Sequence, residues 1–122
     1  MKAMQTVEIR NVTKGTVLAQ QAKMAASLGQ RMKGLLGRDS LPDGQAMILK
    51  PCSAIHTLFM RFSIDVLFLD RQMRIVHLIS NLAPYRFSPT VWASRLVIEL
   101  PAGKISQTKT QIGDILALTS PK

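Results

Sequence analysis

Apolar and polar side chains alternate at the start of this chain, which is the pattern of a β-strand with one buried face. In residues 6–10, Val7 and Ile9 alternate with polar neighbours. A turn-rich stretch at 11–15 follows, and residues 17–19 are apolar again. Because two extended runs on either side of a short turn favour antiparallel pairing, we predict an opening β-hairpin.

The apolar positions then change to helical spacing between residues 28 and 37. The stripe consists of Leu28, Met32, Leu35 and Leu36. Ser27 precedes it as a candidate N-cap, and Gly37 follows as a candidate C-cap. We therefore predict one short α-helix near residues 28–37.

The remainder of the chain reads as short apolar runs separated by turn residues. The predicted strands are 46–50, 55–61, 64–69, 75–80, 96–100 and 115–119. A turn at 70–73 joins two of them, and the proline-containing stretch 81–90 predicts a surface loop. Many short strands with one helix indicate a mainly β, single-domain antiparallel β-sandwich or small barrel over residues 1–122.

Composition adds a strong positive charge to this fold. Sixteen Lys and Arg against seven Asp and Glu give a net charge of +9. This charge favours an anionic partner, such as a small anion, a nucleic acid, an anionic lipid or an acidic protein surface, although it also serves solubility. We expect a cytoplasmic protein without an integral membrane segment, because no signal peptide or membrane-length apolar run is visible. The single cysteine fits a reducing compartment, and a leader removed from the natural chain stays open.

Short motifs for familiar chemistry are missing from the sequence. There is no Walker loop, no dinucleotide fingerprint, no Cys-x-x-Cys pair and no His-Glu-x-x-His. We therefore predict no cofactor and no metal, and the sequence leaves open whether the protein is an enzyme.

A series of weaker motifs occurs in a characteristic order. It comprises Arg31-x-x-Gly34-Leu35-Leu36-Gly37-Arg38, Leu41-Pro42-x-Gly44-x-x-Met47, His56-Thr57, Ile64-Asp65-x-x-Phe68-Leu69-Asp70, Val97-Ile98-Glu99-Leu100-Pro101-Ala102-Gly103 and Gly113-Asp114. From about residue 30 to residue 118, this set resembles the small bacterial and archaeal family named domain of unknown function 192. The resemblance implies a mainly antiparallel β-sandwich with a short helix, and it implies no activity. The chain departs from the family pattern at Ser63, where proline is usual, and at Met73, where glycine is usual. Since Met disfavours positive φ, we expect a different type of turn at Met73.

Two acidic residues lie within apolar strands, where a buried charge needs a partner. Asp65 shares its predicted strand face with Leu67 and Leu69. Its carboxylate would pair with Arg61, Arg95 or His56, cap backbone amides, or form one wall of a ligand pocket. Glu99 alternates with Ile98 and Leu100 and is expected on the exterior of the sandwich, with pairing to Arg31 or Arg38 or a role in a site as alternatives.

Cys52, His56 and Met60 follow one another at intervals of four residues. On a strand this spacing separates neighbours by about 13 Å, which is too far for one shared ion. The same distance argues against Cys52, His56 and Asp65 as nucleophile, base and orienting acid. We therefore favour an inert thiol and a hydrogen-bonded histidine.

The hypothesis that combines these features is a binding or accessory module with a basic site near the helix and the 84–90 loop. Its charge would come from Arg31, Arg38, Arg86 and Arg95, and its contact area from Tyr85 and Trp92. The alternatives are that the loop aromatics are a hydrophobic plug, that His56 and Asp65 form a small-ligand enzyme or sensor site in an apolar pocket, or that an edge strand serves assembly.

Overall fold

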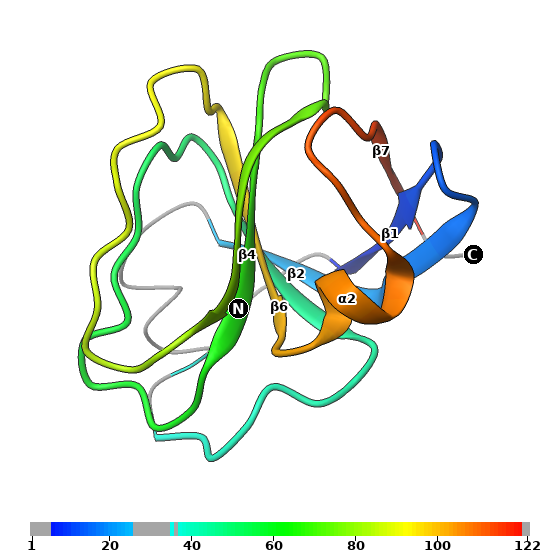
Figure 1. Ribbon diagram of the computed structural model, residues 1–122. Coiled ribbons are helices and arrows are strands. Elements are labelled where there is room, and N and C mark those ends of the chain that lie inside the picture. Colours follow the sequence, from blue (N-terminus) through cyan, green and yellow to red (C-terminus); the bar gives the residue numbers. More distant parts are fainter. Residues whose placement is uncertain (1–5, 26–34, 36, 121–122) are drawn as a thin grey trace, which may run out of the picture.

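The computed structural model describes residues 6–25, 35 and 37–120 (Figure 1). In this part of the chain, seven strands form one sheet, accompanied by one short helix. These elements are β1 (Thr6–Asn11), β2 (Thr16–Ala25), β3 (Gln45–Leu49), β4 (Ile64–Leu69), β5 (Ile75–Leu82), β6 (Leu96–Pro101), α2 (Lys104–Thr108) and β7 (Leu116–Thr119). The mainly β class predicted from the sequence is confirmed.

The strand order is β5-β4-β6-β3-β2-β1-β7. Neighbouring strands are antiparallel except for β2 and β3, which run parallel with Gln21 opposite Gln45. A parallel pair requires a crossover connection, and here that connection lies between β2 and β3. The helix predicted near residues 28–37 falls in this connection and, apart from Leu35 and Gly37, lies outside the described residues.

The sheet curls so that its two outer strands meet at one end. Arg74 and Ile115 form an isolated antiparallel bridge. The Ile75 amide donates to the Asp114 carbonyl at 2.9 Å, and the Gly113 amide donates to the Ile75 carbonyl at 2.8 Å. The sheet is therefore a half-barrel that hydrogen bonds close at this end.

Apolar side chains pack on both faces of the sheet. One cluster gathers strand residues such as Ile98 and Leu100 with Ile105 of α2. The second gathers Val97 and the alternate positions of β4 with Ile55 and Met60, which belong to a loop. Because both faces are covered, every residue of β4 is buried, and its apolar run is almost continuous instead of alternating.

The structure corrects three predictions. Residues 55–61 are not a strand: they form a loop in which His56 makes only an isolated bridge with Phe87. The helix α2 was not predicted, because its five residues are too short for a helical apolar stripe. The expectation about Met73 was also wrong, since Met73 adopts the left-handed conformation with φ of 64°.

Candidate functional site

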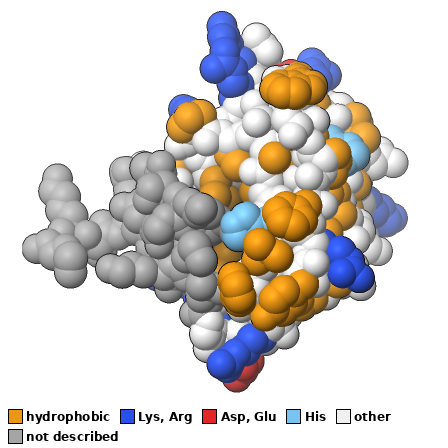
Figure 2. Space-filling model, turned by 90° about the vertical axis from the view of Figure 1, so that its left-hand side faces the viewer, with side chains coloured by type: hydrophobic (Ala, Val, Ile, Leu, Met, Phe, Trp, Pro, Cys, Tyr) orange, Lys and Arg blue, Asp and Glu red, His pale blue; other side chains and the backbone are white. Residues whose placement is uncertain are grey.

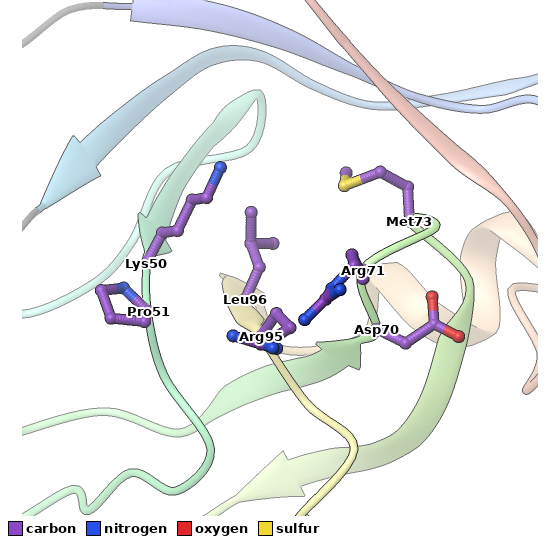
Figure 3. A pocket seen from close by; sticks show the side chains of 7 residues that line it. All are labelled: Lys50, Pro51, Asp70, Arg71, Met73, Arg95 and Leu96. Carbon is purple, nitrogen blue, oxygen red and sulfur yellow. The ribbon is translucent and has the colours of Figure 1, made fainter.

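A pocket of about 220 Å³ opens where the end of β3, the β4–β5 turn and the start of β6 meet (Figure 3). Its lining residues are Lys50, Pro51, Asp70, Arg71, Met73, Arg95 and Leu96. Three of the seven are cationic, and we call this site the cationic pocket. Pro51, Met73 and Leu96 give it apolar walls beside these charges.

Backbone hydrogen bonds fix the two segments that carry the arginines. The Asp70 Oδ1 atom accepts the amides of Gln72 at 2.9 Å and Arg74 at 3.0 Å, so the turn that presents Arg71 closes around this carboxylate. Arg95 is anchored on both sides of its backbone. Its amide donates to the Leu69 carbonyl at 2.8 Å, and its carbonyl accepts the Cys52 amide at 3.1 Å.

The charges of Lys50, Arg71 and Arg95 are not neutralised by the part of the chain that the structure describes. Within residues 6–25, 35 and 37–120, none of the three makes an ion pair or a side-chain hydrogen bond. The acid of the pocket, Asp70, uses Oδ1 in the turn, and its carboxylate points away from the cations in Figure 3. An anion entering this space would therefore meet three cationic groups that have no partner among the described side chains.

The four arginines of the predicted basic site do not gather at this pocket. Arg95 lines it, whereas Arg86 lies earlier in the same loop between β5 and β6, with its Nη1 atom 3.4 Å from the Tyr85 carbonyl. Arg38 donates from Nη2 to Gln45 Oε1 at 3.1 Å, and Arg31 lies outside the described residues.

Sequence reasoning missed Lys50 and Arg71. Lys50 follows directly on the end of β3, and Arg71 lies two residues beyond the end of β4, in the turn before β5. Cations are common at such positions, so nothing local in the sequence separates these two from other surface residues.

Asp65 is a structural acceptor of backbone amides, as one of the sequence alternatives proposed. It is 1% exposed on the β4 face that packs against α2. Its Oδ1 accepts the Asn81 amide at 2.8 Å, and its Oδ2 accepts the amides of Gly103 at 3.1 Å and Ile105 at 2.8 Å. The carboxylate thus joins β5 to the first turn of α2.

His56 occupies a different part of the molecule. Its Nδ1 accepts the Leu58 amide at 3.2 Å, and its ring lies 6.1 Å from the Phe87 ring, in the loops that cover the other face of the sheet. The two residues therefore lie on opposite faces of the sheet, and this placement does not support the shared site suggested from the sequence.

Glu99 corrects a further expectation. It was expected on the exterior, but it is completely buried in β6, opposite Met47 of β3 and Val66 of β4. Its neighbours belong to the loop-covered cluster, and its carboxylate is not isolated there. Pairing with Arg31 falls outside the described residues.

The distance argument for Cys52, His56 and Met60 loses its basis, because the segment is a loop and not a strand. The Cys52 thiol donates to the Ala54 carbonyl at 3.2 Å. Among the described residues, no three His, Cys, Asp or Glu side chains come together in a way that could hold a metal ion. Likewise, no helix in the described ranges is long and apolar enough to cross a bilayer.

The loop aromatics are exposed instead of forming a plug. Tyr85 is 56% exposed, Phe87 of the same loop is 71% exposed and Trp92 is 88% exposed, and Phe59, which the sequence did not single out, is 63% exposed. The interpretation of these rings as a hydrophobic plug is therefore wrong.

Two acidic side chains elsewhere have perturbed titration. Burial raises the pKa of Asp114, but hydrogen bonds from Asn11, Lys14 and the Gln111 amide, together with the Lys14 charge, outweigh it and hold that pKa below the ordinary value. The Lys104 ammonium, by hydrogen bond and by charge, lowers the pKa of exposed Asp43. Asp43 joins its loop to α2, and Asp114 joins the end of β1 to the loop before β7; neither lines the cationic pocket.

Comparisons with known proteins agree on one family. The family model DUF192, described as Uncharacterized ACR, COG1430, matches residues 9–118. A UPF0127 protein of Thermococcus sibiricus is 33% identical over 108 residues, which cover 85% of this chain and 70% of that protein. A UPF0127 protein of Pyrococcus furiosus is 32% identical over 111 residues, which cover 87% and 93%. Both sequence relatives are archaeal.

A solved structure shares the fold. The crystal structure of a protein of unknown function from Novosphingobium aromaticivorans matches with a TM-score of 0.78, covering 93% of this chain and 84% of that chain. The sequence identity is 21%, so this likeness speaks for the fold alone.

Proposed function

Since this chain belongs to the DUF192 family, whose relatives named above carry no assigned activity, we propose from its own side chains that it is a binding module for a small anionic ligand. The anionic group, a phosphate or a carboxylate, lies between Lys50, Arg71 and Arg95. The observation that carries the proposal is the convergence of these three cations on one pocket without an ion pair to any described residue.

The donor chemistry of the pocket suits an oxyanion. Each guanidinium presents several N–H groups in a planar fork that matches two oxygens of a phosphate or carboxylate, and the Lys50 ammonium adds a mobile point charge. Pro51, Met73 and Leu96 stand beside these donors and would contact an apolar portion of the ligand. The preferred ligand therefore carries one anionic group and a small apolar body.

The dimensions of the pocket favour a small anion over the other anionic partners that the charge allows. A volume of about 220 Å³ is below that of ordinary drug-sized sites. A duplex nucleic acid is bound through many phosphate contacts along an extended surface, whereas this pocket brings three cations together at one point.

The test measures the binding of inorganic phosphate and phenyl phosphate by amide chemical-shift titration, following the amides of Arg95 and Cys52. We expect phenyl phosphate to bind more tightly, because the apolar walls contact its ring. Arg95→Gln should weaken binding about five- to tenfold, since one charge-assisted contact at an open site contributes about 1–1.5 kcal/mol.

The matched control is Arg10→Gln, which removes the same charge from an exposed residue paired with Glu8 on β1. It should leave the affinity within about twofold. Equal affinities of the wild type and the Arg95→Gln and Arg71→Gln variants would refute the proposal, as would binding that does not weaken as salt is raised.

A further inference from the structure

The face of the molecule beyond the cationic pocket carries most of its aromatic side chains. The chain has one Trp, one Tyr and four Phe. Trp92, Tyr85 and two of the phenylalanines, Phe59 and Phe87, are all more than half exposed. They belong to the loops 50–63 and 83–95, which lie together at the left of Figure 1, and we call these four residues the aromatic face.

Hydrogen bonds join the two loops into one surface. The Thr57 amide donates to the Arg86 carbonyl at 2.9 Å, and the Tyr85 amide donates to the Thr57 carbonyl at 2.9 Å. The buried Thr57 hydroxyl donates to the Ala83 carbonyl at 2.6 Å and accepts the Arg86 amide at 2.9 Å. The exposed rings are thus presented by a fixed scaffold.

Two of the rings are held outward by unusual backbone geometry. Phe59 has φ of 65° and Tyr85 has φ of 60°, a left-handed conformation that residues with bulky side chains rarely adopt. Their rings meet edge to face, with centroids 5.7 Å apart, and both stay exposed. Strained conformations persist where the surrounding structure enforces them, and they gather at functional surfaces.

The charged residues within the two loops of the aromatic face are all basic, and one of them, Arg61, pairs with exposed Asp39 of a neighbouring segment at 3.4 Å. The loops 50–63 and 83–95 contain Lys50, Arg61, Arg86 and Arg95, and neither loop contains an Asp or Glu. Figure 2 views the molecule from this side and shows hydrophobic side chains gathered on the surface with Lys and Arg at its margins. The occupant must therefore offer apolar contact and negative charge together.

The aromatic face is also continuous with the cationic pocket. A shallow hollow beside the pocket is lined by Trp92, Cys52 and Ser94, and it shares Pro51 and Arg95 with the pocket. A partner that contacts Trp92 would therefore also cover the cationic pocket.

We propose that the aromatic face docks on an anionic lipid bilayer, with the exposed rings entering the interface and the basic residues facing lipid phosphates. Aromatic rings, Trp and Tyr above all, favour this interfacial zone, where one end of the ring is apolar and the other is wet. Each Lys or Arg near an anionic bilayer strengthens attachment about fivefold. A second copy of the chain fits less well, because docking two such faces would bring cationic loops together with no acid in them. This inference goes beyond the pocket: Lys50 and Arg95 belong to both surfaces, but the apolar contact comes from the four exposed rings, none of which lines the pocket.

The test uses the fluorescence of Trp92, the only tryptophan, with vesicles of phosphatidylcholine alone or mixed with phosphatidylglycerol. Trp92 is 88% exposed, so its emission starts at the wavelength typical of water. We expect a blue shift, and quenching by brominated lipid, with the anionic vesicles and much less change with the neutral ones. No shift with anionic vesicles at low salt would overturn the proposal.

Variants assign the effect to the aromatic face. Phe87→Ser keeps the fluorophore and should weaken vesicle binding about tenfold in co-sedimentation. The matched control is Ile112→Ser, which removes an apolar side chain of 60% exposure from the loop that precedes β7. It should bind vesicles as the wild type does, and an equal loss in both variants would show that the aromatic face is not the docking surface.

The other occupants give distinct results that overturn the proposal. A blue shift that depends on protein concentration without vesicles, with dimers in sedimentation, would assign the face to a second copy. Tighter quenching by a single-stranded oligonucleotide than by vesicles would assign it to nucleic acid. Phosphate titration of Phe87→Ser separates the two proposals, because the pocket should bind phosphate normally in this variant whether or not the bilayer proposal holds.

Discussion

The carboxylate of Asp65 allows a quantitative prediction, because three backbone amides depend on it. In Asp65→Asn, one oxygen becomes an NH₂ group that cannot accept a hydrogen bond. The remaining oxygen keeps the most hydrogen bonds in the position of Oδ2, where it still accepts the amides of Gly103 and Ile105. The amide of Asn81 then faces a donor in place of an acceptor.

The expected cost follows from these three contacts. Hydrogen bonds to a charged acceptor contribute about 1.5–3 kcal/mol each, and neutral ones about 1 kcal/mol. Losing one bond and weakening two should lower the free energy of unfolding by about 3 kcal/mol, which lowers the melting temperature by about 10 °C in a domain of this size. Urea unfolding followed by circular dichroism measures the change.

Asp70→Asn is the matched control. Both amides bound by Asp70 are accepted by the single atom Oδ1, so an asparagine can keep them, and the expected cost is below about 1 kcal/mol. If Asp65→Asn lost no more stability than Asp70→Asn, the carboxylate would not be what fastens α2 and β5 to β4. Hydrogen exchange at Ile105 gives a second readout, since its amide should exchange faster in Asp65→Asn alone.

Two further predictions concern stability at other places. Because the pKa of Asp114 is lower in the folded state than in the unfolded chain, its contribution is present above about pH 4 and lost as the pH falls through the folded pKa. Asp114→Asn should therefore be less stable than the wild type in urea at pH 7, with a smaller difference at pH 3, and an undiminished gap at pH 3 would contradict this account. Thr57→Val removes the hydrogen bonds to Ala83 and Arg86 and should cost about 2 kcal/mol with faster exchange in residues 83–88, whereas exposed Thr90→Val should cost little.

The strands could be predicted where an apolar or alternating run arises from burial within the sheet itself. Residues 64–69 form β4 as predicted, and 6–10 and 96–100 each extend by one residue. The prediction of a strand at 55–61 was wrong because the apolar side chains of this segment cover the sheet from a loop. Ile55 and Met60 pack on the sheet from a loop, while Phe59 is held at the surface. An apolar loop that covers a sheet and an apolar strand within it look alike in sequence.

Of the candidate site, the sequence predicted the positive charge and one residue, Arg95. The net charge of +9 indicated an anionic partner, but no local pattern placed Lys50 and Arg71 beside Arg95. Their meeting depends on the β4–β6 pairing and on the 70–74 turn. Asp65 was identified as a residue that needed partners, but those partners are backbone amides, which carry no sequence signature.

The position of β1 between β2 and β7 has a consequence for biosynthesis. β1 can form a hairpin with β2 as soon as both have left the ribosome, but its other edge pairs with β7, where Asn11 lies opposite Leu116. At roughly 5–20 residues per second, that edge waits several seconds for its partner strand. During this interval the nascent chain exposes an unsatisfied strand edge, so translation speed and chaperone capture should influence its yield more than they influence a protein built from local pairings.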